Sequence, residues 1–293
     1  MIPTGISTSC TNYLTTFDGD ASFTSCTNIY TTALASFAPS ANTSLPSSSA
    51  VATALDTLCA ANATSPCPQS TLTTQLSAFY AACSAELTSA PNPSVKLLYD
   101  VLYVLQPLRQ SVCSKDDNGN FCATELTNSS STGTVALVDP EASQKQAQLD
   151  SYLYSTSSTT GAAARRDLSN STTILIPNAT TFEDTNLVFL FLNPSNPSCT
   201  TCTRNILTSY ISFESTCPYA PGINSSLLLA GQSALYNNIT NTCGANFLSG
   251  AVQAAGGISS GLVSGAAPRA GAQELSAAVS AILGVVAFVA ASV

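Results

Sequence analysis

The sequence predicts a mainly α-helical protein: one or more disulfide-stapled helical bundles, a low-complexity Ser/Thr-rich linker and a hydrophobic C-terminal tail. Three observations support this fold class. Apolar residues recur at intervals of three and four over most of the chain, as on one face of a helix. The chain contains 11 cysteines, which is typical of a disulfide framework. Residues 275–293 contain no charged side chain.

The first expected unit is a Cys-rich helical block at residues 9–125. The stretches "SFTSCTNIYTTALASF" (22–37) and "PQSTLTTQLSAFYAAC" (68–83) both place apolar residues at helical spacing. Pro68 suits the first turn of the second stretch, because proline is tolerated there. Each stretch therefore predicts a helix.

Two further helices are expected in this block. Residues 51–58 show the same spacing over a shorter segment. Residues 94–113, "SVKLLYDVLYVLQPLRQSVC", are the most hydrophobic stretch of the block. We expect a helix there that kinks or ends at Pro107, since proline removes a backbone hydrogen bond.

Residues 126–180 are expected to form a Ser/Thr-rich linker with one short helix. Residues 127–134 and 155–173 are small, hydroxylated and free of aromatic side chains, which is typical of linkers. Asp139 followed by Pro140 has the pattern of a helix start. The short helix is therefore expected to follow Asp139.

A second Cys-containing helical block is expected at residues 181–250. Thr181 and Asp184 have capping-box spacing, which predicts a helix, although residues 187–192 are equally compatible with a buried strand. Two more helices are expected from the apolar positions Ile206, Tyr210 and Phe213 and from Leu228, Leu235 and Ile239, and Gly244 is a suitable stop for the last.

The spacing of the cysteines in the first block limits their pairing. Cys67 and Cys83 lie at opposite ends of one expected helix, which separates them by about 24 Å. A disulfide needs Cα atoms within about 7 Å, so these two cysteines should bond to neighbouring helices. Short sequence separations favour Cys113–Cys122 and Cys59–Cys67 as local bridges.

The second block contains four cysteines. Antiparallel helices would bring Cys243 back towards Cys199 or Cys202 and leave Cys217 at the far end. Because the first block has seven cysteines, one of them is left unmatched. We therefore expect a bridge between the blocks and at least four disulfides in all.

The C-terminal region has the composition of a GPI-attachment signal. Such a signal combines small residues at the attachment point, a short polar spacer and a hydrophobic tail that is removed. Residues 251–274 form the small-residue spacer, with Ser264 and Gly265 as the expected attachment residues and Gly256 to Gly261 as alternatives. Residues 275–293 form the tail. Two other interpretations are a membrane helix that is retained, since its length of about 28 Å is adequate, and a buried core helix.

Several features predict an extracellular chain on the outer face of the plasma membrane or in the cell wall. Only 8% of the residues are charged, and cysteines are frequent, as in oxidised, secreted proteins. The first ten residues lack the basic and apolar regions of a signal peptide, so we expect the true start to lie upstream. N-glycosylation is expected at seven Asn-x-Ser/Thr sites: Asn42, Asn62, Asn128, Asn170, Asn178, Asn224 and Asn238.

The cysteine framework resembles a family of uncharacterised fungal cell-surface proteins known only as a domain of unknown function. The likeness is carried by "SCTNYLTTFDGDASFTSC" (9–26), by the spacing of Cys59, Cys67 and Cys83, by "CSKDDNGNFC" (113–122) and by "NPSCTTCTRNILTSY" (196–210). It implies a secreted, GPI-tailed, helical protein. It implies no activity.

Composition excludes several classes of function. The chain has no histidine, which removes Ser-His-Asp and Cys-His catalysis and histidine metal sites. The net charge is −8, and the eight basic residues are scattered, so neither a nucleic-acid interface nor a polybasic lipid surface is expected. No cofactor or enzymatic activity is predicted.

Three motifs that occur in catalytic or metal sites have simpler structural interpretations. "CTTC" (199–202) has redox spacing, but a secreted setting favours structural disulfides to different partners. "DDNGN" (116–120) lacks the Gly and Glu positions of a calcium loop and reads as a tight turn. Close acid pairs, which a glycosidase could use, are expected to cap helices or face solvent: Asp18 and Asp20, Asp116 and Asp117, Glu183 and Asp184.

The favoured function is a structural, adhesive or interaction glycoprotein, with cell-wall polysaccharide as a candidate partner. A helical module that binds a lipid or another apolar molecule, and an enzyme using carboxylates, are the alternatives. Arg165 and Arg166 form the only adjacent basic pair. They are either solvated or a dibasic processing site, since linkers are accessible to proteases.

Overall fold

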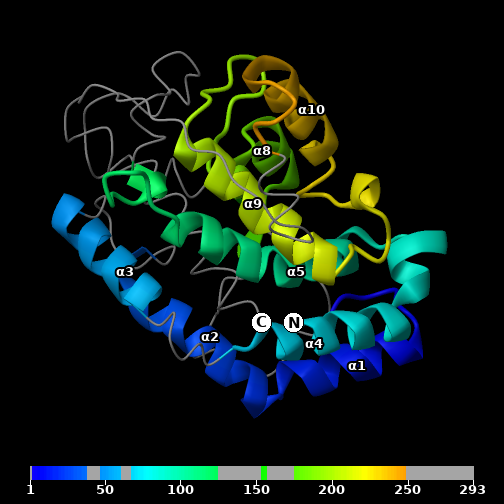
Figure 1. Cartoon of the computed structure of the whole chain (residues 1–293). Coiled ribbons are helices and arrows are strands. Elements are labelled where there is room, and N and C mark those ends of the chain that lie inside the picture. Colours follow the sequence, from blue (N-terminus) through cyan, green and yellow to red (C-terminus); the bar gives the residue numbers. More distant parts are fainter. Residues whose placement is uncertain (1, 38–46, 61–66, 125–152, 157–174, 249–293) are drawn as a thin grey trace.

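The computed structural model describes residues 2–37, 47–60, 67–124, 153–156 and 175–248, and this part of the chain is mainly helical, as predicted. The central element is α5 (Pro93–Cys113), of which 13 of 21 residues are buried. A helix that is buried on most of its circumference serves as the core of the molecule. Helices α1 to α4 lie on one side of α5, and α8 to α10 lie on the other (Figure 1).

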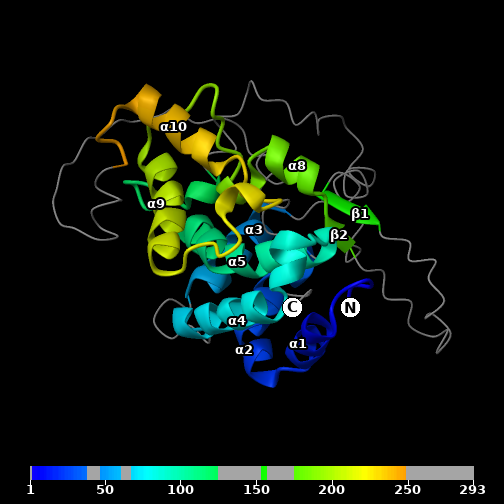
Figure 2. The ribbon, with the colours of Figure 1, turned by 90° about the vertical axis from the view of Figure 1, so that its right-hand side faces the viewer.

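The first layer consists of α1 (Thr8–Asp18), α2 (Ala21–Ala33), α3 (Ser48–Ala60) and α4 (Gln69–Ala82). Helix α1 packs on α4 and α2 packs on α3, while α3 and α4 contact α5 (Figure 2). The 3₁₀ turn η1 (Ala35–Phe37) and the π-helical turn η3 (Ala85–Ser89) complete the layer. Helices α2, α3 and α4 lie in the stretches where helical spacing predicted them, whereas α1 was not predicted.

Local sequence explains where α5 begins and why it is long. The Asn92 side chain accepts hydrogen bonds from the backbone N–H groups of Ser94 and Val95, and Pro93 occupies the first turn. Of the two effects predicted for Pro107, a kink or an end of the helix, the second is wrong, because α5 continues to Cys113. Packing of α3, α4 and α9 around α5 stabilises the helix beyond the proline.

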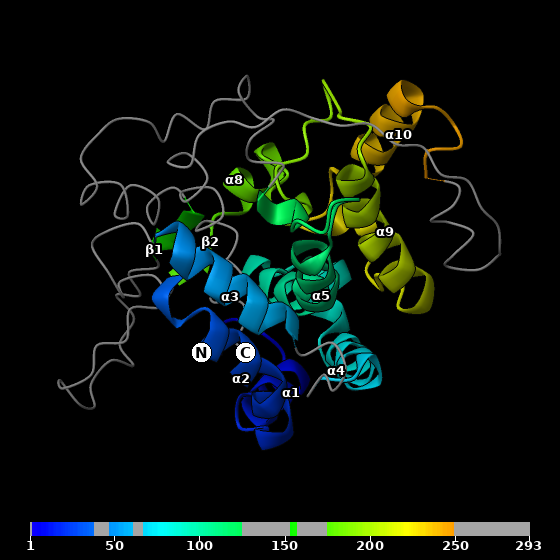
Figure 3. The same cartoon turned by 60° about the vertical axis from the view of Figure 1, so that its left-hand side comes forward.

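The second layer begins with a two-stranded antiparallel sheet at one edge of the molecule (Figure 3), in which β1 (Tyr154–Thr156) pairs with β2 (Leu175–Pro177). It continues with α8 (Ala179–Asp184), the 3₁₀ turn η4 (Leu187–Phe189), α9 (Thr201–Thr216), the 3₁₀ turn η5 (Ile223–Ser225) and α10 (Gln232–Cys243). The predicted helix at 206–213 is confirmed. The helix before Gly244 is confirmed through Leu235 and Ile239, whereas Leu228 lies before its start at Gln232; Gly244 follows α10 with φ of 95°.

Two predictions for this layer are wrong. The residue that caps α8 is Asn178, whose side chain accepts from the Thr181 N–H, rather than Thr181 itself. Residues 187–192 form neither a continuous helix nor a strand: η4 is followed by Leu190 and Phe191, which both have positive φ. Burial of this apolar stretch against α5 and α9 compensates for the strained backbone.

The two helical blocks share one hydrophobic core. The Tyr103 ring on α5 meets the Phe213 ring on α9 edge-on, with 5.1 Å between centroids. Tyr99 meets the Tyr219 ring in the same way at 5.3 Å. Edge-to-face aromatic pairs add to the stabilisation from burial, so α5 is held against both α9 and the chain that follows it.

Candidate functional site: the junction of the two helical blocks

Five disulfides account for ten of the 11 cysteines, and the remaining Cys217 has a buried free thiol. Cys67 and Cys83 both bond to other helices, as predicted from the length of α4. The prediction of at least four disulfides is therefore confirmed. The pairs are Cys10–Cys83, Cys26–Cys67, Cys59–Cys113, Cys122–Cys202 and Cys199–Cys243.

The predicted local bridges Cys113–Cys122 and Cys59–Cys67 are wrong. Cys113 is the last residue of α5 and bonds to Cys59 near the end of α3, with Cα atoms 5.4 Å apart. Cys122 bonds to Cys202 on α9 instead. Because α3 and α9 lie on opposite sides of α5, two cysteines close in sequence bond to opposite layers (Figure 1).

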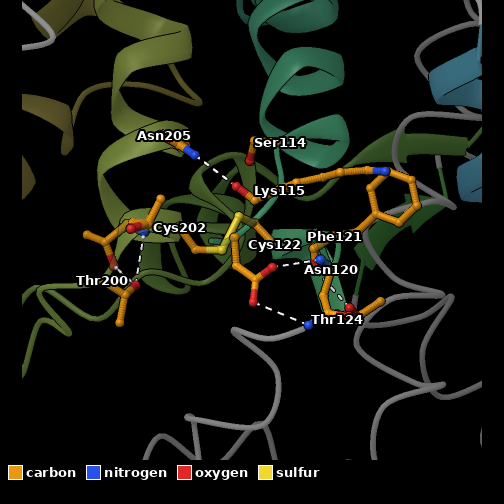
Figure 4. Close-up of a disulfide and its surroundings, with 12 residues drawn as sticks. Ser114, Lys115, Asn120, Phe121, Cys122, Thr124, Thr200, Cys202 and Asn205 are labelled. Carbon is orange, nitrogen blue, oxygen red and sulfur yellow. Dashed lines mark hydrogen bonds between the residues drawn. A yellow bond between two sulfur atoms is a disulfide. The ribbon is translucent and has the colours of Figure 1, made fainter. Parts of the chain in front are cut away.

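The bridge Cys122–Cys202 joins the two blocks, as expected from the unmatched cysteine (Figure 4). Both cysteines are buried, and their Cα atoms are 5.2 Å apart. On the α9 side, the Thr200 hydroxyl accepts from the Thr203 N–H and caps the helix. The predicted bond between Cys243 and either Cys199 or Cys202 is also confirmed, with Cys199 as the partner.

The turn before Cys122 docks on the start of α9. Lys115 and Phe121 face each other in an antiparallel bridge, and the Asp116 carboxylate accepts from the Asn118 and Asn120 N–H groups at 3.0 and 2.6 Å. Asn205 donates to the Lys115 carbonyl at 3.0 Å (Figure 4). The prediction of a tight turn is confirmed, although Cys122 closes it onto α9 and not onto Cys113.

The other motifs also have structural roles in the described residues. Cys199 and Cys202 bond to different partners, so "CTTC" is not a redox pair. Asp18, Glu183 and Asp184 are exposed at helix ends, as expected for solvated acids. Within the described ranges, no group of three or more Cys, Asp or Glu side chains is arranged to hold a metal ion.

A buried carboxyl at the centre of α5 lies on the contact with the second block. Asp100 has no exposed surface. It accepts hydrogen bonds from the Tyr219 hydroxyl and, at 2.6 Å, from the Leu227 N–H. Burial raises the pKa of Asp100 to about 6, although these hydrogen bonds oppose the rise.

A second carboxyl, that of Glu214, is half-buried near the end of α9 and faces α10. Both oxygens of Glu214 accept from the Gln232 side-chain amide, at 2.6 and 2.7 Å. Burial raises the pKa of Glu214 to about 7. The Oε1 atom of Gln232 is buried and has no hydrogen-bond partner among the described residues.

Sequence reasoning missed both carboxyls. A signal existed for Asp100, which is the only acid in the most hydrophobic stretch of the first block. A charge in such a helix is rare unless it is paired or hydrogen-bonded. No local signal identified Glu214, because its partner Gln232 lies 18 residues further along the chain.

The predicted modification sites are divided between described and undescribed parts of the chain. Asn224 and Asn238 are exposed, and Asn178 is half-buried as the cap of α8. The other sites lie outside the described residues: Asn42, Asn62, Asn128, Asn170, the processing pair Arg165 and Arg166, and the attachment residues Ser264 and Gly265. A cut at Arg165–Arg166 would leave the products joined by Cys122–Cys202.

Comparison with known proteins adds one match. Residues 3–138 match the family described as a domain of unknown function, DUF7729. The match agrees with the resemblance over the first block and does not extend to residues 196–210, which also carried it. The match covers α1 to α5 and ends before Cys202, the partner of Cys122. No curated protein and no solved structure matches the chain. None of the described helices is both long and apolar enough for a membrane span.

Proposed function

We propose that this protein is a non-enzymatic glycoprotein of the outer cell surface, attached by a GPI anchor, with a structural, adhesive or interaction role. The observation that carries the proposal is the set of five disulfides, one of which joins the two blocks. Disulfides form and persist in oxidising, extracellular surroundings and are rare in the cytosol. A core fixed at so many points suits a protein that must keep its shape outside the cell.

The proposed anchoring and decoration rest on the sequence. Residues 264–293 combine small residues, a spacer and an uncharged tail in the order that a GPI signal requires. Asn224 and Asn238 are exposed within acceptor motifs, so glycans can be accommodated there without disturbing the core. A fungal source, and cell-wall polysaccharide as the partner, are part of the same proposal.

The alternative, a module for a lipid or another apolar molecule, is less well supported. A hollow between α2 and α3 has a volume of about 370 Å³, which is within the range of small-molecule sites. Such sites are lined mainly by hydrophobic and aromatic side chains. Here the lining consists of hydroxyl-bearing residues and alanines: Thr32, Ala33, Ser49, Ala50, Thr53, Ala54 and Thr57.

Phosphatidylinositol-specific phospholipase C is expected to release the protein from intact cells. The lipase cleaves the lipid of a GPI anchor and cannot release a protein held by a peptide segment. The measurement is the amount of protein in the medium before and after treatment, together with the mass of the C-terminal peptide. As a matched control, a chain that lacks residues 275–293 should never attach to the membrane.

Membrane-bound protein that resists the lipase and keeps residues 275–293 would contradict the anchoring. Attachment of the shortened control chain would contradict the role of the tail.

A further inference from the structure

Residues 217–231, which we call the 217–231 segment, connect α9 to α10 and are held by two carboxyls, the buried Asp100 and the half-buried Glu214. Asp100 on α5 accepts from Tyr219 and from the Leu227 N–H within the segment. Glu214, just before the segment, accepts from Gln232, just after it. The two carboxyls thus fix the segment against α5 and close it at its base.

We propose that the 217–231 segment is a pH-sensitive latch, closed when Asp100 and Glu214 are protonated and loosened when they ionise. The device gives the protein its tightest packing in acidic surroundings. It requires only that both carboxyls hold a proton more tightly while the segment is docked than when it is open.

The amide hydrogen bond from Gln232 lowers the pKa of Glu214, but burial and the unpartnered Gln232 Oε1 favour the neutral form. A carboxylate only accepts, so ionised Glu214 can bind the N–H groups of Gln232 but leaves the buried Gln232 Oε1 without a donor. A protonated Glu214 can donate to Oε1 while its other oxygen accepts from the amide. Protonation therefore satisfies a buried polar atom that otherwise has no partner.

Burial of Asp100 acts in the same direction and outweighs the hydrogen bonds from Tyr219 and Leu227, which lower its pKa. Asp100 lies in the middle of an apolar helix with no exposed surface, where a charge is costly. The Tyr219 hydroxyl can accept as well as donate, so a protonated Asp100 keeps this contact. On ionisation the contact remains, but a charge is then placed in the core.

The titratable and charged groups around the two carboxyls are phenols, one thiol and one ammonium. Around Asp100 they are Tyr99 and Lys96 on α5, and Cys217 and Tyr219 in the segment. Lys96 donates to the Ser225 carbonyl at 2.9 Å. Around Glu214 they are Tyr103 on α5, Tyr210 on α9 and Tyr236 on α10.

The direction of the pH effect follows from burial. It raises the pKa of Asp100 from 3.8 to about 6 and that of Glu214 from 4.5 to about 7. A docked segment therefore holds its protons more tightly than an open one. Docking is fully stabilised below the pKa values of the open state, near pH 4, and weakens as the pH rises through 6 and 7.

Cys217 provides a direct readout, because it lies at the start of the segment and is the one cysteine without a disulfide. The full-length protein is labelled with 4,4′-dithiodipyridine from pH 5 to pH 8. At each pH, the rate for protein unfolded in guanidinium is divided by the native rate, which removes the pH dependence of the thiol itself. We expect this protection factor to fall about 10-fold or more between pH 5 and pH 8.

Variants assign the effect to the carboxyls. Glu214→Gln keeps an amide partner for Gln232 and cannot ionise, so its protection factor should change clearly less with pH than that of the wild type. Asp100→Asn should reduce the dependence further where it folds. Glu183→Gln, a change at an exposed acid, should behave as the wild type.

Equal protection of the wild type at pH 5 and pH 8 would overturn the latch. Undiminished pH dependence in Glu214→Gln would overturn it as well.

Discussion

A chain that ends at residue 138 is expected not to form the native fold, although it contains the whole region that matches the domain of unknown function. The reason is that α5 is a shared core helix. On α9, Phe213 is buried against Tyr103 of the first block, and Tyr210 is buried against Phe189 of η4. Without α9, Tyr103 and its neighbours on α5 lose their cover, at about 1.5–3 kcal/mol for each large side chain exposed.

The shortened chain also loses specific partners. Cys122 has no Cys202 to bond with, and Asp100 loses both the Tyr219 hydroxyl and the Leu227 N–H. These losses together exceed the stability of about 5–15 kcal/mol that a typical domain has.

The measurement is thermal unfolding followed by near-UV circular dichroism, together with binding of a dye that reports exposed apolar surface. A chain of residues 1–248 is the control and should unfold cooperatively. A cooperative transition and a native near-UV spectrum from residues 1–138 alone would show that α9 is dispensable for the fold.

Loss of the bridge between the blocks is expected to have the second largest effect. Replacing Cys122 and Cys202 together by serine opens a loop that spans 80 residues. The chain-entropy estimate for a loop of this length is about 4 kcal/mol. For a protein of this size, that corresponds to a decrease in Tm of about 10 °C.

Cys217→Ala is the matched control, because it removes a buried cysteine without removing a cross-link. The comparison requires the Tm of both variants under non-reducing conditions. The double serine variant should lose clearly more stability than the control. Equal losses would mean that Cys122–Cys202 contributes no more than ordinary side-chain packing.

The helices could be predicted from the sequence because their burial is one-sided and periodic. In α4, Leu72, Leu76 and Phe79 are the buried residues, at spacings of four and three. The same periodicity identified α9 through Ile206, Tyr210 and Phe213. Residues 187–192 are apolar without a period, so neither the 3₁₀ turn nor the positive φ values of Leu190 and Phe191 could be inferred.

The disulfide pairing could be predicted only where geometry excluded alternatives. The length of α4 ruled out a bond between Cys67 and Cys83, and this held. Proximity in sequence suggested Cys113–Cys122, but the partner of Cys113 depends on which helix ends meet, and α3 brings Cys59 to the end of α5. Such an arrangement is set by tertiary packing and leaves no trace in the spacing of the cysteines.

The most direct test of this account is a disulfide map of the native protein by mass spectrometry of non-reduced peptides. We expect cross-linked peptides for the five pairs and a single alkylated cysteine at Cys217. The decisive peptide joins Cys122 to Cys202, since it alone connects the two blocks. Mostly free thiols would contradict the extracellular assignment, and a peptide that joins Cys113 to Cys122 would contradict the fold.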